Sequence, residues 1–165
     1  MARIFTRNSG NSMTSICIID TSVFCNVLGI PNRAQRQQES LDQLKVFIEM
    51  GATLLLPMAT IYETGNHIAQ NGNGRMRREL AKKFIEQVQQ AFSGEAPWTP
   101  TPMQALEEIV AWLNEFPDWA MRGAGFGDLS IFKVYEEQCA LHAGCRVFIW
   151  SYDQHLAAYD RPAQI

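Results

Sequence analysis

Residues 16–22 have the sequence ICIIDTS, in which four apolar residues end abruptly at an acid and two hydroxyls. A run this short and this apolar predicts a β-strand that is covered on both faces, as in a parallel sheet. Asp20 then lies at the carboxyl end of the strand, where ligands and chemistry collect in open α/β sheets. An acid in this place is also common as a turn residue or helix N-cap, so Asp20 alone does not decide between a site and a cap.

The length of 165 residues suits one domain with a real core, and the composition is that of an ordinary globular protein. We expect residues 1–14 to form a flexible tail and residues 15–165 a single domain. No apolar run approaches the ~20 residues that span a bilayer, and the first residues lack the apolar core of a secretory signal. We therefore expect a cytoplasmic protein with no membrane partner. Its four cysteines include no C-x-x-C pair, which favours buried free thiols over disulfides or zinc.

Apolar runs at residues 52–56 and 146–150 predict two further strands, and amphipathic segments between the strands predict helices. The expected helices cover residues 22–28, 38–50, 58–69, 75–92, 102–113, 128–142 and 154–159, with an irregular stretch at 115–119. In the helix at 102–113 we expect Leu106, Ile109, Val110 and Leu113 to form the buried face. This alternation predicts an α/β fold, a three-layer α/β/α arrangement with a central, mostly parallel sheet. Residues 75–119 are a helical expansion of that plan, with a minor strand near Trp98 or Trp119.

Three more acids follow the pattern of Asp20. Asp153 comes just after the strand at 146–150, Glu63 lies in the second turn of the helix after 52–56, and Asp128 opens a helix. Each has a structural alternative as a cap or first-turn acid, although Pro57 indicates a helix start that places Glu63 too deep for a capping box. Four carboxylates at one sheet edge repel one another unless a cation lies between them, and Mg²⁺ or Mn²⁺ is the natural candidate.

Four segments carry a resemblance to a known family: IIDTS at 18–22, IYE at 61–63, GFGDLSI at 125–131 and WSYD at 150–153. Together they resemble the PIN domain, the nuclease fold of many prokaryotic toxins of the VapC type and of RNA-processing enzymes. The acids occur in the family's order, and the resemblance spans residues 15–159. The chain departs from the pattern in its expanded segment and in Ser151, where the family often has threonine.

The resemblance implies a PIN-like fold and an endoribonuclease, a hydrolase that depends on Mg²⁺ or Mn²⁺ and cleaves phosphodiester bonds with metal-activated water. Asp20, Glu63, Asp128 and Asp153 would be its catalytic and metal-binding residues. Ser22 and Ser151 would support them, although Ser22 serves equally well as a helix cap. By analogy with the toxins, the resemblance also implies an antitoxin protein and a homodimer as partners.

RNA has to approach an acidic edge across a basic rim. The candidate RNA-binding residues are Arg33, Arg36, Asn66, Arg75, Arg77 and Arg78. A solvated helix face is an equal explanation for the cations at 75–83. The net charge of −3 neither indicates nor excludes nucleic-acid binding.

Two rival functions remain to be weighed. One is a catalytically inactive PIN-fold module that binds RNA or protein, and the presence of all four acids argues against it. The other is a phosphotransfer domain of the receiver or dehalogenase type. The receiver type needs neighbouring early acids and a late lysine, and the dehalogenase type needs an acid where this chain has Ser22, so neither fits.

Overall fold

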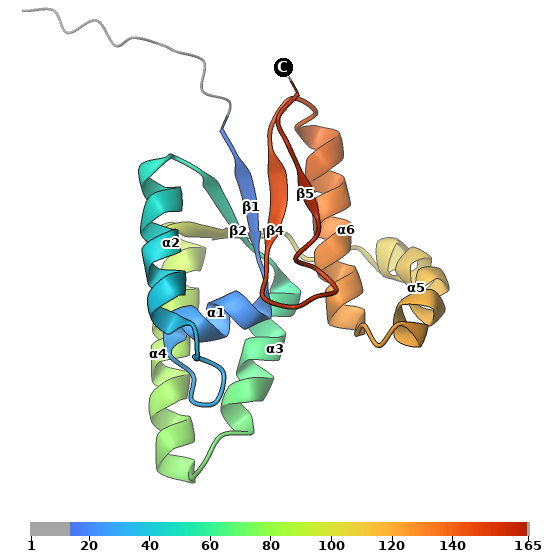
Figure 1. Cartoon of the computed structure of the whole chain (residues 1–165). Coiled ribbons are helices and arrows are strands. Elements are labelled where there is room, and N and C mark those ends of the chain that lie inside the picture. The colour runs from blue at the N-terminus through green and yellow to red at the C-terminus, as the bar shows by residue number, and fades with distance from the viewer. Residues whose placement is uncertain (1–13, 165) are drawn as a thin grey trace, which may run out of the picture.

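The apolar run at residues 16–19 forms the central strand of a five-stranded sheet, and all four of its residues are buried. The computed structural model describes residues 14–164, so the expected tail falls outside the described residues except for Thr14. Within that range the chain has an α/β fold (Figure 1). Its elements are β1 Ile16–Ile19, α1 Thr21–Leu28, α2 Gln37–Glu49, β2 Thr53–Leu56, α3 Met58–Ala69, α4 Gly74–Ser93, β3 Trp98–Pro100, α5 Leu106–Met121, α6 Phe126–Leu141, β4 Val147–Trp150 and β5 Asp160–Arg161.

The sheet is mostly parallel, as the sequence predicts. Its strand order is β3-β2-β1-β4-β5, and only β5 runs antiparallel to its neighbour. Ile18 lies beside Leu55 of β2 on one side and Ile149 of β4 on the other. The carboxyl ends of β1, β2 and β4 therefore meet at one edge of the sheet.

Alternate residues of β1 point into two different cores, which produces the predicted three layers. Cys17 and Ile19 pack with apolar residues of α1, α2 and α4. Ile16 and Ile18 pack with α6 and with Trp119 of α5 on the opposite face. All four cysteines are free thiols in the described part of the chain. Cys17 and Cys25 are buried as expected, whereas Cys139 and Cys145 are only half-buried.

The expected start of α5 at residue 102 is wrong. Thr101 donates its backbone N–H to the carbonyl of Leu56 at 3.0 Å, so the chain still follows the sheet edge there. The helix begins at Leu106, where Glu108 accepts the N–H of Ala105 at 2.8 Å. It then continues through residues 115–119, with Pro117 at an exposed position inside the helix.

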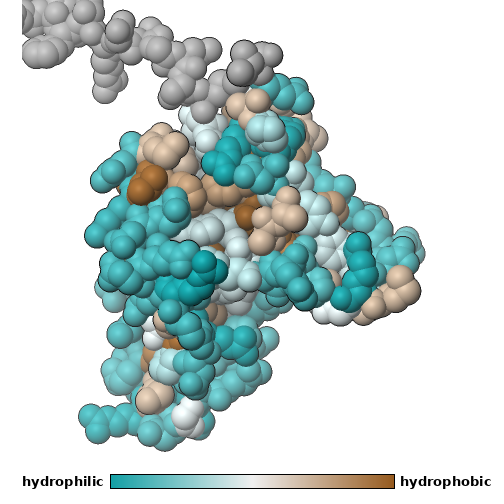
Figure 2. Space-filling model, viewed as in Figure 1, coloured by the Kyte–Doolittle hydropathy of each residue, from teal (hydrophilic) through white to brown (hydrophobic). Residues whose placement is uncertain are grey.

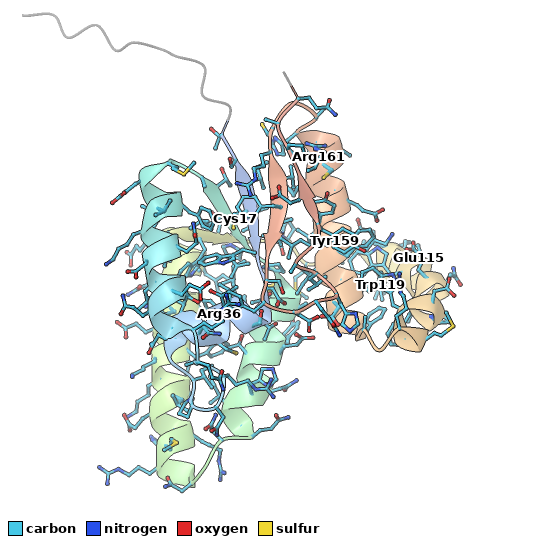
Figure 3. The ribbon with its side chains drawn as sticks, viewed as in Figure 1. Cys17, Arg36, Glu115, Trp119, Tyr159 and Arg161 are labelled. Atoms are coloured by element: carbon cyan, nitrogen blue, oxygen red, sulfur yellow. The ribbon has the colours of Figure 1, made fainter. Side chains whose placement is uncertain are left out.

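The expected buried face of α5 is also wrong. Leu106, Val110 and Leu113 are exposed, and Ile109 is half-buried. The helix instead packs on α6 through Trp112, Phe116 and Trp119. Trp119 is labelled in Figure 3. These aromatic side chains remove more apolar surface from water than the aliphatic ones, which is why they take the inner side.

The structure also locates the minor strand and corrects the expected start of α6 and the expected last helix. The minor strand is β3, at Trp98, whereas Trp119 is helical. Helix α6 begins at Phe126, so Asp128 is its third residue rather than its first. Residues 154–159 form turns instead of a helix, because they return the chain to β4, where Ile149 donates its N–H to the carbonyl of Tyr159 at 2.9 Å.

Candidate active site

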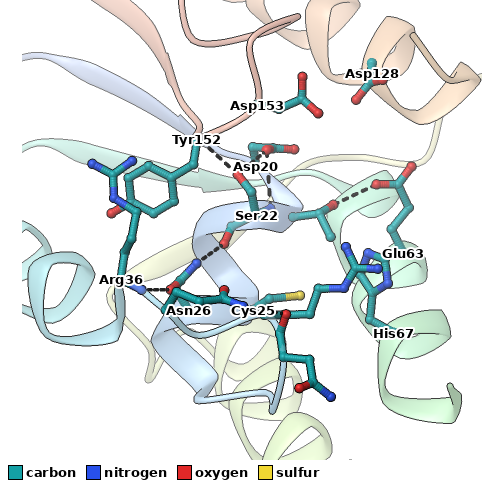
Figure 4. A pocket seen from close by; sticks show the side chains of 14 residues that line it. Asp20, Ser22, Cys25, Asn26, Arg36, Glu63, His67, Asp128, Tyr152 and Asp153 are labelled. Atoms are coloured by element: carbon teal, nitrogen blue, oxygen red, sulfur yellow. Dashed lines mark hydrogen bonds between the residues drawn. The ribbon is translucent and has the colours of Figure 1, made fainter. Parts of the chain in front are cut away.

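A pocket of about 330 Å³ opens at the carboxyl edge of the sheet (Figure 4). All four predicted carboxylates line it, although they come from four separate elements. Asp20 follows β1, Glu63 lies in α3, Asp128 in α6, and Asp153 follows β4. The structure therefore brings together the four acids that the sequence predicts to meet.

Asp20 lies at the centre of a hydrogen-bond network and is only 3% exposed. Its Oδ2 accepts the hydroxyl of Ser22 at 2.6 Å and that of Ser151 at 2.7 Å. The same oxygen accepts the backbone N–H of Ser22 at 3.3 Å, so Asp20 also caps α1. Both predicted supporting serines thus contact Asp20, which caps α1 and also lines the pocket.

The two serines also join the ends of β1 and β4. Ser22 Oγ accepts the backbone N–H of Tyr152 at 2.9 Å, and Ser151 Oγ accepts that of Asp153 at the same distance. Each hydroxyl therefore donates to Asp20 while it accepts from the chain beyond β4. This arrangement fixes Asp153 relative to Asp20.

Glu63 is the sixth residue of α3, whose N-cap is Pro57, so it lies beyond the reach of a capping box. Its Oε2 accepts the hydroxyl of Thr21 at 2.8 Å. Its other oxygen lies so close to Gly127 that an added β-carbon there would be 1.7 Å away. Glu63 is thus held between the start of α1 and the start of α6.

Asp128 and Asp153 also make local backbone contacts of the capping kind. Asp128 accepts the N–H of Gly125 at 2.7 Å, and Asp153 accepts the N–H of His155 at 2.7 Å. Each of these bonds uses one oxygen of the carboxylate. The structural role and the place in the pocket therefore coexist in both residues.

Two of the four carboxylates, Glu63 and Asp128, have raised pKa values. Burial raises the pKa of Glu63, and the charges of Asp128, Asp20 and Asp153 raise it further. Burial likewise raises the pKa of Asp128, with Asp153 and Asp20 adding to the effect. Hydrogen bonds from Thr21 and Gly125 offset part of these shifts. Within residues 14–164, no lysine or arginine forms an ion pair with any of the four acids.

This donor set suits a hard divalent cation, because carboxylate oxygens are the ligands that Mg²⁺ and Mn²⁺ prefer. Zinc is a poorer match, because among the described residues the Cys and His that line the pocket, Cys25 and His67, form no metal-holding group with the acids. Among the described residues, however, no three Asp, Glu, His or Cys side chains already stand in a metal-holding arrangement.

The pocket is also lined by residues with basic side chains, which we call the basic wall. It includes Arg33 and Arg36 from the loop after α1, together with His67 one turn beyond Glu63. Burial and the charge of Arg33 lower the pKa of His67, which favours its neutral form. The lining of the pocket therefore combines four acidic side chains with two arginines.

The two arginines differ in how they are held. Arg36 pairs with Glu39 through two hydrogen bonds of 2.7 and 2.8 Å, and its guanidinium lies 4.0 Å from the ring centre of Tyr152. Arg33 has no ion pair or side-chain hydrogen bond within the described residues, so its charge is available to a ligand.

The other candidate RNA-binding residues do not line the pocket. Asn66 lies exposed on α3, and Arg75 and Arg78 lie exposed at the start of α4. Arg77 donates to the carbonyls of Asn71 and Gly72 at 3.0 and 2.8 Å, which ties it to the turn before α4.

Three residues of the site were missed by the sequence reasoning. Thr21 binds Glu63, and its place in the Asp-Thr-Ser tripeptide was the available signal. Asn26 accepts the N–H of Arg36 at 2.8 Å and donates to the carbonyl of Ser22, four residues earlier. Gly127 permits the approach of Glu63, and its position beside Asp128 was the signal for it.

A scan against protein-family models found no match for the chain, and searches of curated proteins and of solved structures found none either. None of the helices in residues 14–164 is both long enough and apolar enough to cross a membrane.

Proposed function

We propose that the chain is a Mg²⁺- or Mn²⁺-dependent endoribonuclease of PIN-like fold that hydrolyses phosphodiester bonds in RNA. One observation carries the proposal: Asp20, Glu63, Asp128 and Asp153 meet in one pocket from four separate elements. Carboxylates placed together in this way repel one another, and a divalent cation is the simplest group that relieves the repulsion. Capping does not explain Glu63, which is the sixth residue of α3 and still lines the pocket with the other three acids.

Asp20, Asp128 and Asp153 would hold the cation, which would supply a Lewis acid to the scissile phosphate. The hydroxyls of Ser22 and Ser151 hold the carboxylate of Asp20 in one orientation, so this side chain need move little when the cation binds. Glu63, held by Thr21, would position the attacking water on the same side. Hydrolysis of this kind needs no protein nucleophile and leaves a 5′-phosphate and a 3′-hydroxyl.

The basic wall supports a polyanionic substrate. Arg33 would bind a phosphate next to the scissile one, because its charge is unpaired and faces the same pocket. Arg36 would act mainly by holding the loop and Tyr152 in place. Asn66, Arg75, Arg77 and Arg78 remain candidates for contacts with RNA outside the pocket.

A second candidate is a PIN-fold module that binds RNA or protein without cleaving it. One observation favours it: within residues 14–164 no three acids are already arranged around a metal position. In either case the resemblance to toxins suggests cytoplasmic action, an antitoxin and a homodimer, and these stay part of the proposal.

The test is a cleavage assay on a mixture of single-stranded and structured RNA, with Mn²⁺ or EDTA, for the wild type and Asp20→Asn. Glu107→Gln, which removes an exposed carboxylate on α5, is the matched control. We expect Mn²⁺-dependent cutting that Asp20→Asn abolishes and Glu107→Gln preserves. A folded wild type that neither cuts RNA nor binds Mn²⁺ would favour the binding module.

A further inference from the structure

Helix α5 carries an apolar stripe that nothing in the described chain covers. Its members are Leu106, Val110, Leu113 and Met121, which are 77, 60, 52 and 80% exposed. At 3.6 residues per turn, all four lie within roughly 80° of arc on one side of the helix. We call this set the α5 stripe.

The stripe projects from the body of the molecule. Figure 1 shows α5 standing apart on the outer side of α6. In the space-filling view this projection is mostly teal, with a few tan atoms at its outer end (Figure 2). The inner side of α5 is already occupied by Trp112, Phe116 and Trp119, which pack in the core. The stripe is therefore a second apolar face of α5, in addition to the aromatic face that already packs against the core.

A contiguous apolar face of this kind marks an interaction surface, because single exposed apolar residues are common but aligned ones are not. The spacing of Leu106, Val110 and Leu113, at i, i+4 and i+7, is the pattern by which one helix packs against another. The geometry thus favours a helical partner segment over an extended one.

The charge of α5 indicates the chemistry of that partner. Between Leu106 and Met121 the helix has Glu107, Glu108, Glu115 and Asp118 and no cation. Glu115 pairs with Lys133 at 2.7 Å, and Glu108 accepts the N–H of Ala105. Glu107 and Asp118 have no such partner among the described residues, and the helical spacing places both along one edge of the stripe.

We propose that the α5 stripe is the docking surface for a basic amphipathic helix of a partner protein. The stripe would receive the apolar face of that helix, and Glu107 and Asp118 would pair with its lysines or arginines. Pairing of α5 with α5 of a second copy is disfavoured, because it would bring these carboxylates toward one another. An anionic membrane surface is disfavoured by the same charges.

The test uses the full chain and two synthetic 18-residue helical peptides with the same leucine stripe. One peptide carries lysines beside the leucines, and the other carries glutamates. We expect saturable 1:1 binding of the lysine peptide, at least tenfold tighter than that of the glutamate peptide. Leu106→Gln/Val110→Gln/Leu113→Gln and, separately, Glu107→Lys/Asp118→Lys should each weaken the binding at least tenfold. These side chains are exposed, so circular dichroism should report an unchanged fold.

The matched control is Ile85→Gln/Phe92→Gln, which removes exposed apolar residues from α4. It should leave peptide binding unchanged. Equal binding of the two peptides, no binding of either, or equal loss in the control would overturn the proposal. Sedimentation equilibrium that shows a dimer dispersed by the triple variant would assign the stripe to a second copy instead. Co-sedimentation with phosphatidylserine vesicles, lost in the triple variant, would assign it to a membrane.

Discussion

The carboxylate of Glu63 lies directly against the backbone of Gly127. A β-carbon added to Gly127 would fall 1.7 Å from Oε1 of Glu63 and 2.7 Å from its Cδ. Glu63 belongs to α3 and Gly127 to the first turn of α6, so this contact sets how closely the two helices bring Glu63 and Asp128 together. Any side chain at residue 127 has to displace Glu63.

Gly127→Ala should therefore impair the site without unfolding the protein. We expect at least a tenfold loss of RNA cleavage and weaker Mn²⁺ binding, because Glu63 has to move away from the other acids. Gly125→Ala is the control, since its β-carbon would meet Asp128 only at an ordinary 3.7 Å. Cleavage rates and Mn²⁺ titrations of the two variants make the comparison. Equal activity of Gly127→Ala and wild type would mean that the position of Glu63 is unimportant for the reaction.

Asp128→Asn should stabilise the protein near neutral pH. It should also reduce cleavage by at least about 100-fold, because loss of a proposed direct ligand should cost no less than the most that loss of an outer-shell metal partner costs. Asparagine can still accept the N–H of Gly125, so the cap survives. The folded-state pKa values of Asp128 and Glu63 are raised. The folded state therefore binds more protons, and the free energy of unfolding falls as pH rises from about 4 through the raised values.

Urea unfolding between pH 4 and 8 measures this effect. The fall in unfolding free energy should be shallower in Asp128→Asn than in the wild type. Mn²⁺ should stabilise the wild type, because a ligand that binds the folded state adds stability. It should stabilise the variant less, because the variant lacks the Asp128 carboxylate. A steeper fall in the variant would contradict the assigned repulsion.

The sequence could predict the site because each acid follows a strong local signal. Asp20 and Asp153 come directly after buried strands, and parallel strands bring their carboxyl ends to one edge. Glu63 could be placed because Pro57 marks the start of α3. The contact between Glu63 and Gly127 depends on the spacing of two helices that lie far apart in the sequence, and no local pattern reports that distance.

The face of α5 shows a different limit. The helix contains two apolar sets, one aliphatic and one aromatic, and periodicity alone does not tell which set meets α6. Pro117 is the reason that a break in the helix is expected at residues 115–119. The helix continues through this proline, which lies on its exposed side. Strand β5 has only two residues, which is too short for an alternation pattern to show.

Ser151→Ala should weaken both stability and cleavage. It removes the hydroxyl that donates to Asp20 and accepts the N–H of Asp153, so two partners lose a hydrogen bond. A hydrogen bond to a charged group contributes about 1.5–3 kcal/mol, and we expect a loss of unfolding free energy in that range. Ser151→Thr keeps the hydroxyl and should retain most of the cleavage activity. If Thr and Ala were equally damaging, the hydroxyl would not be the feature that matters at residue 151.

Arg33→Ala and Arg36→Ala should fail in different ways. The loop that carries both is fixed by Asn26, which accepts the N–H of Arg36, and by Asn71, which donates to the carbonyl of Pro31 at 3.3 Å. Loss of Arg33 removes an unpaired charge from the pocket, so KM for RNA should rise about tenfold while the melting temperature stays unchanged. Loss of Arg36 removes the contact with Glu39 and Tyr152, so the melting temperature should fall.

Steady-state kinetics at two salt concentrations separates the two arginines. A phosphate contact releases a counterion, so the salt dependence of RNA binding should be weaker in Arg33→Ala than in the wild type. Arg36→Ala should keep the wild-type salt dependence, because its charge is already paired with Glu39. An unchanged KM and salt dependence in Arg33→Ala would place the phosphate contacts elsewhere, and Arg75 and Arg78 at the start of α4 would be the next residues to replace.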